Sequence, residues 1–412
     1  MEFDAEVALS YARAISRPRQ VGSGEDEKVA EEIAARLEQF GYQVERQLFQ
    51  FSTAPTWFLQ LEILAGLLLI LMTGWARRYG PWAEALPAAM LLLLLFAIGS
   101  INRMVEANSV APDPDALVSL WSAMCLRMGT RHATANLVAI RRDLPDDPTL
   151  PHLYLVAHYD SKSQWMPLAV RIALFTAAIL GSLSFAGLTL LGSARPALAF
   201  AANVAGVVVV GAGLPLLFLG AGNASPGAID NASGVGLVLH LAECLAQRSD
   251  LFGKLRVTVL LTSAEELTLG GAFAFVRRNE DRLRRQAKAG GLYVLNLDGP
   301  GVDGKLYMVG EENSRLASDA SPASDASLAG LVRAACSELR VPLGRFSLPG
   351  AMFDHIPFAR CGFDAVSLIA VGGASWAVHT PGDSADKLHV RGFEQAGRVV
   401  LRVIEKLATG IL

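Results

Sequence analysis

Long apolar runs interrupt a chain that is otherwise ordinary in polarity. Charged residues are absent from residues 63–76, 85–102, 172–194 and 196–229. A bilayer-spanning helix needs about 20 mostly apolar residues, and the two later runs meet that length. The second run is near the limit, and the first reaches it only with residues 57–62 included. Trp57, Trp75 and Trp82 near the ends favour a membrane over the alternative of buried core helices, because indoles settle at the membrane interface.

The four apolar runs pair into two hairpins. Their connectors, "RRYGPWAE" and "SARP", are too short to hold a domain. The polar parts on either side of each hairpin therefore lie on the same side of the bilayer. We predict one discontinuous globular domain from residues 1–55, 104–166 and 230–412, with transmembrane hairpins at 56–103 and 167–229.

The polar parts show alternating helix and strand patterns. Val29, Ile33, Leu37 and Phe40 recur at helical spacing, and Gly41 follows as a stop signal. The runs "TANLVAIRR", "LPHLYLVAHYDS", "KLRVTVLLTSAEE", "GLYVLNLDGPG" and "AVSLIA" predict strands, while "GVGLVLHLAECLAQR" and "VRGFEQAGRVVLRVIEKLATGI" predict helices. The alternation predicts an α/β fold, with a mainly parallel, doubly wound mixed sheet flanked by helices.

Charge and cysteine content exclude some functions. The formal net charge is −3, which argues against general nucleic-acid binding. The four cysteines are widely spaced and form no CxxC pair, so neither a zinc knuckle nor a disulfide framework is indicated; they are Cys125, Cys244, Cys336 and Cys361. The N-terminal segment lacks an apolar core, so no cleaved signal peptide is expected.

Polar side chains follow the predicted strands at the point where each strand ends. His158 and Asp160 end one strand, Glu265 and Glu266 end another, and Asp298 ends a third. In doubly wound sheets, ligands bind outside the carboxyl ends of the strands. We therefore expect these side chains to lie close together.

Two further candidates come from loops. Asp230 lies in the glycine-bracketed turn "GAIDNASGVG", and His379 lies in "VHTPGDSADKL". Histidine nitrogens and carboxylate oxygens are the ligands that zinc prefers in catalytic sites. The set is large enough for two metal ions sharing a carboxylate, with one glutamate left as a general base. Each residue alone also has a structural explanation as a turn or helix-cap residue.

The ordered segments "AHYDS", "GAIDNASGV", "TSAEE", "NLDG" and "HTPGDSADKL" resemble the co-catalytic zinc aminopeptidase family, which includes relatives of bacterial leucyl aminopeptidase and glutamate carboxypeptidase. The N-terminal helix and strand and the segment "FDHIPFARCGFDAVSLI" also resemble that family. The resemblance covers nearly all of the polar parts and none of the apolar runs. His158 and Asp230 are much farther apart than in those relatives, because the second hairpin lies between them.

The resemblance implies two zinc ions per chain. His158 and Asp298 are the implied ligands of one ion, Glu266 and His379 hold the other, and Asp230 bridges them.

The resemblance also implies roles outside the ligand set. Glu265 is implied to be the general base, which takes a proton from water and passes it to the leaving amine. Asp160 is implied to orient His158, and the Asp230–Asn231 peptide bond is implied to be cis.

The expected function is that of a membrane-anchored zinc aminopeptidase acting on a peptide or amide substrate, with amphipathic substrates included. One alternative is a glutaminyl-cyclase-like acyltransferase or amidohydrolase with a single zinc. Another is a non-enzymatic membrane scaffold, and a transporter is a third class, for which the predicted helices of the later pair of apolar runs offer only Asn203 and a few Ser and Thr as polar residues. The second hairpin either shapes the substrate entrance or only anchors the chain. Basic residues are balanced across both membrane sides, so the positive-inside rule assigns no side to the catalytic domain.

Overall fold

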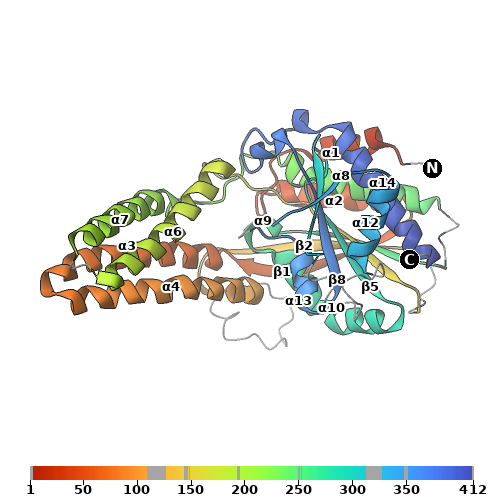
Figure 1. Ribbon diagram of the computed structural model, residues 1–412. Coiled ribbons are helices and arrows are strands. Elements are labelled where there is room, and N and C mark those ends of the chain that lie inside the picture. The colour runs from red at the N-terminus through yellow and green to blue at the C-terminus, as the bar shows by residue number, and fades with distance from the viewer. Residues whose placement is uncertain are drawn as a thin grey trace.

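The computed structural model describes residues 3–108, 127–142, 147, 149–192, 195–248, 251, 253–311, 327–347 and 351–410. An α/β domain forms one part, and a bundle of apolar helices projects from one side of it (Figure 1).

The domain is built on an eight-stranded mixed sheet with the order β1-β2-β4-β3-β5-β8-β6-β7. The strands are β1 (Tyr42–Ser52), β2 (Arg131–Arg141), β3 (His152–His158), β4 (Arg256–Thr262), β5 (Leu292–Leu297), β6 (Lys305–Val309), β7 (Leu343–Arg345) and β8 (Asp364–Val371). The central strands β4, β3, β5 and β8 are parallel, whereas β1, β2 and β6 join by antiparallel pairing. The predicted mixed α/β sheet is confirmed, with its parallel part at the centre.

Helices cover both faces of the sheet. One face carries α1 (Ala5–Ile15), α2 (Glu25–Gln39), α8 (Ser233–Ala246), α12 (Leu328–Glu338) and α14 (Val390–Thr409), and the other carries α10 (Gly270–Ala289) and α13 (His355–Arg360). Alternation along β3 explains both layers, because Leu153 and Leu155 pack into the first core while Tyr154 and Val156 pack into the second. A strand buried on both faces reads as a continuous apolar run, as the sequence pattern indicates.

The N-terminal helix pattern is confirmed for three of its four apolar positions, whereas Phe40 is the half-buried C-cap residue after the helix. Val29, Ile33 and Leu37 of α2 are buried against the sheet. Gly41 then takes a positive φ of 90°, which glycine adopts without steric cost, and β1 begins at Tyr42.

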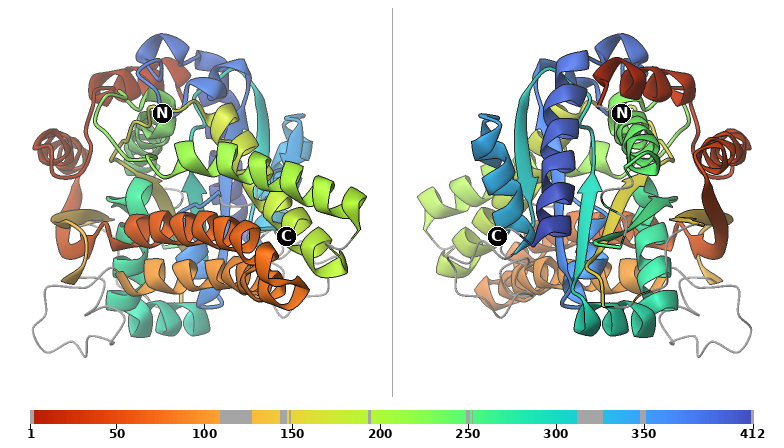
Figure 2. Two further views of the ribbon diagram at one scale, coloured as in Figure 1. Left: turned by 90° about the vertical axis from the view of Figure 1, so that its left-hand side faces the viewer. Right: turned by 90° about the vertical axis from the view of Figure 1, so that its right-hand side faces the viewer.

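The apolar hairpins form a single bundle. Its helices are α3 (Ala54–Ala76), α4 (Pro81–Asn108), α6 (Leu168–Gly192) and α7 (Pro196–Leu216), with the short η1 (Arg77–Tyr79) between the first two. Ile70 of α3, Leu91 of α4, Phe185 of α6 and Val209 of α7 share one buried cluster. Figure 2 shows the two hairpins side by side.

Three of these helical segments are long and apolar enough to cross a membrane, as judged by length and composition. They are Ala54–Tyr79, Leu168–Gly192 and Pro196–Leu216. The fourth contributes a shorter apolar segment within the described residues, Pro81–Phe96. Long apolar helices are thus confirmed for three of the four predicted runs, and their placement in a bilayer stays a prediction.

The far end of the bundle contains paired polar groups. Glu84 is buried and accepts from Nε of Arg77 at 2.8 Å. Arg77 also donates from Nη1 to Oδ1 of Asn203 in α7, at 2.8 Å. Asn203 is therefore a contact between the hairpins, which accounts for a polar residue inside an apolar run.

The cysteines that the structure describes form no disulfide. Cys244 and Cys336 are buried and Cys361 is half-buried, and none of the three forms a disulfide. Cys125 lies outside the described residues, as do positions 109–126 of the predicted domain segment 104–166.

Candidate metal centre

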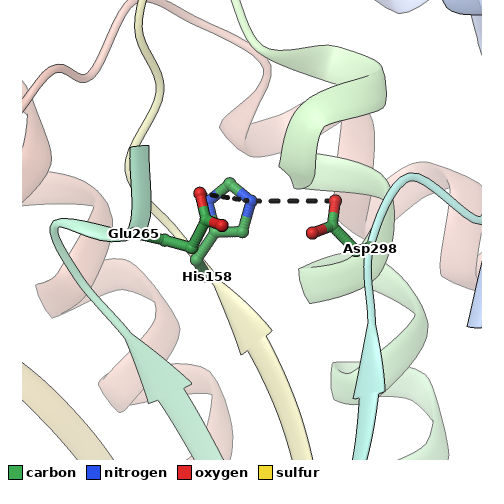
Figure 3. Close-up of side chains that lie close together, drawn as sticks. All are labelled: His158, Glu265 and Asp298. Carbon is green, nitrogen blue, oxygen red and sulfur yellow. Dashed lines mark ion pairs between the residues drawn. The ribbon is translucent and has the colours of Figure 1, made fainter. Parts of the chain in front are cut away.

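Three strands deliver polar side chains to one edge of the sheet. His158 is the last residue of β3, Glu265 and Glu266 open the short helix α9 (Glu265–Thr268) after β4, and Asp298 follows β5. Because β3 lies between β4 and β5, these residues meet, as Figure 3 shows for His158, Glu265 and Asp298. Nε2 of His158 lies 3.8 Å from Oε2 of Glu265 and 3.8 Å from Oδ1 of Asp298.

Asp230 and His379 complete the cluster from loops. Asp230 lies in η2 (Ala228–Ala232), and His379 follows η4 (Gly373–Ala377). Asp230 places Oδ1 3.0 Å from Nε2 of His158 and Oδ2 3.1 Å from Nε2 of His379. Nε2 of His379 also lies 2.9 Å from Oε2 of Glu266. One carboxylate therefore faces both histidines.

The predicted ligands and the predicted base form two donor groups. The first donor group is His158, Glu265 and Asp298, and the second donor group is Asp230, Glu266 and His379; within each, the ligand atoms lie within 4.8 Å of one another. The first group contains Glu265, to which the resemblance assigns the base role.

These donors fit divalent cations. His158 is fully buried, and neither ring nitrogen has a hydrogen-bond partner of good geometry among the described residues. Uncompensated buried carboxylates and an unpaired imidazole are costly unless a cation or hydrogen bonds balance them. Imidazole nitrogen and carboxylate oxygen are zinc ligands, so the donor chemistry fits one ion in each group.

The adjacent glutamates differ electrostatically. Burial raises the pKa of Glu265 well above its ordinary value, and the Asp298 carboxylate adds to this. Burial alone would also raise the pKa of Glu266, but His379 and Lys162 hold it below its ordinary value. Neighbours in sequence therefore occupy different environments.

Asp160 supports the glutamate pair. Its Oδ1 accepts from the backbone N–H of Glu265 at 3.2 Å and its Oδ2 from that of Glu266 at 3.3 Å. Oδ1 lies 3.6 Å from Nδ1 of His158, which is too long for a hydrogen bond. The observed hydrogen bonds are therefore to the glutamate backbone, and orientation of His158 stays a prediction.

A tight turn presents the glutamates. Ala264 and Leu269, on either side of α9, have positive φ angles of 57° and 52°, a region that few non-glycine residues adopt. Gly271 then passes close to Ser263, where an added Cβ would lie 2.4 Å from the carbonyl oxygen. This close approach explains the glycine after the glutamate pair.

The sequence did not identify two basic side chains that lie at the site, Lys162 and Arg171. Nζ of Lys162 lies 2.9 Å from Oε2 of Glu266 and donates to its carbonyl oxygen at 2.6 Å. Nη2 of Arg171, in the first turn of α6, lies 3.0 Å from Nδ1 of His379. Lys162 stands close after His158 in the segment "HYDSKS", which was a usable signal. In the sequence, Arg171 is only the charged residue that precedes the apolar run 172–194, so no sequence feature linked it to the site.

Arg19 joins the loops that carry His158 and Asp230. It is fully buried and donates to the carbonyl oxygens of Tyr159 at 2.5 Å, Pro226 at 2.6 Å and Gly227 at 2.8 Å. Its only sequence signal is its place in the N-terminal segment that resembles the family.

The backbone around Asp230 is held by a second carboxylate. Asp383 accepts from the N–H of Ile229 at 2.6 Å and of Asp230 at 3.3 Å, and burial raises its pKa to about 7. Nδ2 of Asn231 donates to the carbonyl oxygen of Leu297 at 2.8 Å, which links this loop to the end of β5. The Asp230–Asn231 peptide bond is cis, which confirms that prediction.

Asp354 is a further carboxylate near the cluster. It is fully buried before α13 and accepts from the hydroxyl of Thr262 at the end of β4. Burial raises its pKa to about 7. The segment "FDHIPF" contains it, although the sequence assigned it no role.

Solved structures share this fold at low sequence identity. An aminopeptidase from Aneurinibacillus sp. strain AM-1 is 16% identical with a TM-score of 0.55, over 98% of this chain and 94% of that chain. A zinc aminopeptidase from Bacillus subtilis is 16% identical with a TM-score of 0.54, over 98% and 95%. A glutaminyl cyclase from Porphyromonas gingivalis is 15% identical with a TM-score of 0.52, over 98% and 98%.

Sequence comparison identifies the family. No curated protein matches the chain. The family model for peptidase family M28 matches residues 136–404, a span of more than half the chain that includes both donor groups. The matched span, the fold and the two donor groups agree with a zinc metallopeptidase. The chain belongs to peptidase family M28.

Proposed function

We propose that this chain is a membrane-anchored zinc aminopeptidase that hydrolyses N-terminal peptide bonds. The observation that carries the proposal is the position of Asp230, whose two carboxylate oxygens face His158 and His379 at 3.0 and 3.1 Å. A carboxylate between two imidazoles is the arrangement that a bridging ligand of two ions requires.

The proposed ligands follow from these contacts. His158 and Asp298 hold one zinc ion, Glu266 and His379 hold the other, and Asp230 lies between them. When bound, zinc polarises a substrate carbonyl and lowers the pKa of water.

Glu265 is the proposed general base. Its carboxylate points toward His158, whereas that of Glu266 is engaged by Lys162 and His379. Oε2 of Glu265 takes a proton from the attacking water, whose oxygen bonds to the carbonyl carbon. As the C–N bond breaks, Glu265 passes the proton to the leaving nitrogen. The net change is one water added across one peptide bond.

Family membership and fold likeness support an aminopeptidase. The matching structures from Aneurinibacillus and Bacillus subtilis are both aminopeptidases. A peptide with a free α-amine is therefore the substrate class we propose.

The helical bundle supports the membrane part of the proposal. Large apolar side chains such as Leu71, Leu191, Phe200 and Val207 are mostly exposed on its surface. So large an exposed apolar surface is unfavourable in water and suits a bilayer. We expect the chain to stay in the membrane fraction after alkaline carbonate extraction and to leave it only with detergent. Release by carbonate alone would contradict the anchor.

One experiment tests the catalytic proposal. Amino-acid release from a panel of peptides and aminoacyl amides is measured together with zinc content per chain. Glu265→Gln should keep about two zinc ions and lose activity by roughly 10²–10⁴-fold. The control Glu280→Gln removes a solvent-exposed partner of Arg284 and should leave both measurements unchanged. Normal turnover in Glu265→Gln would contradict the assigned base.

A glutaminyl cyclase is the second candidate function, because a cyclase from Porphyromonas gingivalis shares the fold. In that case the chain should hold one zinc ion and cyclise N-terminal glutaminyl peptides with loss of ammonia. Including such a peptide in the panel separates the two candidates.

A further inference from the structure

The second hairpin joins the candidate metal centre directly. His158 ends β3 shortly before α6 begins at Leu168, and Asp230 follows the end of α7. Ser163 and Gly222, on the two connecting segments, exchange backbone hydrogen bonds of 2.7 and 2.8 Å. The two segments that connect the bundle to the domain are therefore hydrogen-bonded to each other.

The loop of His379 is attached to the same junction. The N–H of Gln164 donates to the carbonyl oxygen of His379 at 2.8 Å, and Arg171 of α6 contacts its ring. The short helix η4, which precedes His379, also packs against α6. A proposed metal ligand thus lies at the base of a proposed membrane helix.

Aromatic side chains mark both ends of the bundle. The distal belt consists of Trp75, Tyr79 and Trp82, and the domain-side belt consists of Trp57, Trp165, Phe218 and Trp376. All are more than half exposed. Along α3, the helical rise from Trp57 to Trp75 is about 27 Å at 1.5 Å per residue, which matches the ~30 Å hydrocarbon core of a bilayer.

Three members of the domain-side belt lie beside the metal centre. Trp165 and Phe218 are 63% and 74% exposed, and Nε1 of Trp165 donates to the carbonyl oxygen of Phe218 at 2.9 Å. Trp376 is 59% exposed and lies in η4, directly before the His379 loop. Exposed tryptophans settle at the headgroup layer of a membrane. The position of these side chains therefore indicates that the headgroup layer lies next to the His379 side of the metal centre.

We propose that the metal centre opens at the bilayer surface, and that its substrates are peptides held in the bilayer by an apolar segment. Their free N-terminus enters the site at headgroup level. This inference rests on the proposed aminopeptidase function and names the substrate class for it. The domain-side belt holds the entrance of the site against the lipid. The second hairpin forms part of this entrance rather than acting as a remote anchor.

A spacer-length experiment tests the inference. The full chain is reconstituted in phosphatidylcholine nanodiscs, and each substrate carries the same N-terminal residues, a polar spacer and an apolar segment of about 20 residues. Spacers of about 5 and about 20 residues reach at most roughly 17 and 70 Å above the apolar segment. A soluble peptide with the same N-terminal residues is assayed in parallel.

The short-spacer peptide should be cleaved as fast as the long-spacer peptide, with a KM at least about tenfold below that of the soluble peptide, because both partners share the membrane. Cleavage that requires the long spacer would place the site away from the lipid and overturn the inference, while the aminopeptidase function would stand. Equal kcat/KM for soluble and membrane-held peptides would also overturn the inference and leave the aminopeptidase function standing. Absence of cleavage for every peptide by the zinc-loaded protein would overturn both.

Variants of the belt give a second measurement. The double variant Trp165→Ser/Trp376→Ser should raise the KM for the short-spacer peptide several-fold. Trp82→Ser removes an exposed indole from the distal belt and should keep the preference for the short-spacer peptide over the soluble one. Release from the soluble peptide, measured on each preparation, shows whether a variant is folded. An unchanged preference in the folded double variant would contradict the role of the belt.

Discussion

Arg171 of α6 reaches the ring of His379, with Nη2 lying 3.0 Å from Nδ1. An arginine N–H only donates, so Nδ1 is the acceptor and Nε2 carries the ring proton of a neutral His379. If Nε2 of His379 held a metal ion, the proton of the neutral ring would sit on Nδ1 and would face the N–H donor and the positive charge of Arg171. Arg171 would therefore disfavour the tautomer that His379 needs in the proposed ligand role.

Replacing Arg171 by glutamine should strengthen zinc binding in the second donor group. The carbonyl of a glutamine side chain accepts from Nδ1–H, as outer partners of metal-bound histidines commonly do. We expect Arg171→Gln to bind zinc in the second donor group about tenfold more tightly, in the range known for such outer partners. Competitive titration with a chromophoric chelator measures this. Arg195→Gln, at the far end of the bundle, serves as the control, and weaker zinc binding in Arg171→Gln would contradict the prediction.

Asp160 should matter for activity more than for folding. Its two oxygens accept from the N–H groups of Glu265 and Glu266, and asparagine offers only one acceptor oxygen for them. We expect Asp160→Asn to lose about 10–100-fold in kcat/KM for amino-acid release, since partners that hold ligands typically contribute that much. The exposed Asp281→Asn is the matched control. Full activity in Asp160→Asn would show that the turn carrying Glu265 and Glu266 keeps its conformation without Asp160, and would contradict the prediction.

Arg19 should stabilise the fold. Arg19→Met removes the donor to five carbonyl oxygens, including those of Tyr159, Pro226 and Gly227, and each buried group left unsatisfied costs about 1–3 kcal/mol. We expect a loss of roughly 3–5 kcal/mol in the free energy of unfolding, measured by urea denaturation in detergent, with part of it restored in Arg19→Lys. Arg17→Met removes half-exposed ion pairs to Glu25 and Glu32 and should cost about 1 kcal/mol or less. Equal effects at positions 17 and 19 would contradict the prediction.

His355 should make stability depend on pH. Burial lowers the pKa of His355 to about 4, and its Nδ1 pairs with Oγ of Ser367 at 2.7 Å. An unfolded histidine titrates near pH 6.5, so between about pH 4 and 6.5 the unfolded chain binds more protons than the folded chain. Stability from this group is fully present above pH 6.5 and is lost as pH falls toward 4, by up to about 1.4 kcal/mol per pH unit.

Comparing urea unfolding from pH 7 to pH 4 tests this contribution. His355→Gln should show a shallower loss of stability than the wild type across that range. Phe353→Leu disturbs the ring that stacks on His355 and should lower stability while keeping the wild-type pH dependence. Parallel pH profiles for the wild type and His355→Gln would contradict the assignment.

Several features of the site could be predicted because they are local in sequence. His158, the glutamate pair and Asp298 each follow an apolar run, and parallel strands bring their carboxyl ends to one edge. Asp230 and His379 were candidates from their loop segments rather than from a strand pattern, and the resemblance supplied the ligand roles expected of them. The apolar runs were equally visible, since charge is absent from them.

The sequence by itself predicted the six ligand and base candidates that the structure brings together, which segments are apolar, and that the core is a mixed sheet in an α/β fold. Only the tertiary structure showed that the two hairpins form one bundle, that Asp160 holds the glutamate backbone, and that Lys162 and Arg171 reach the second donor group. The physical reason is distance along the chain: Asp160 bonds a residue 105 positions away, and Arg171 contacts one 208 positions away. Apolar periodicity is a property of neighbouring residues, whereas such contacts exist only after the chain has packed.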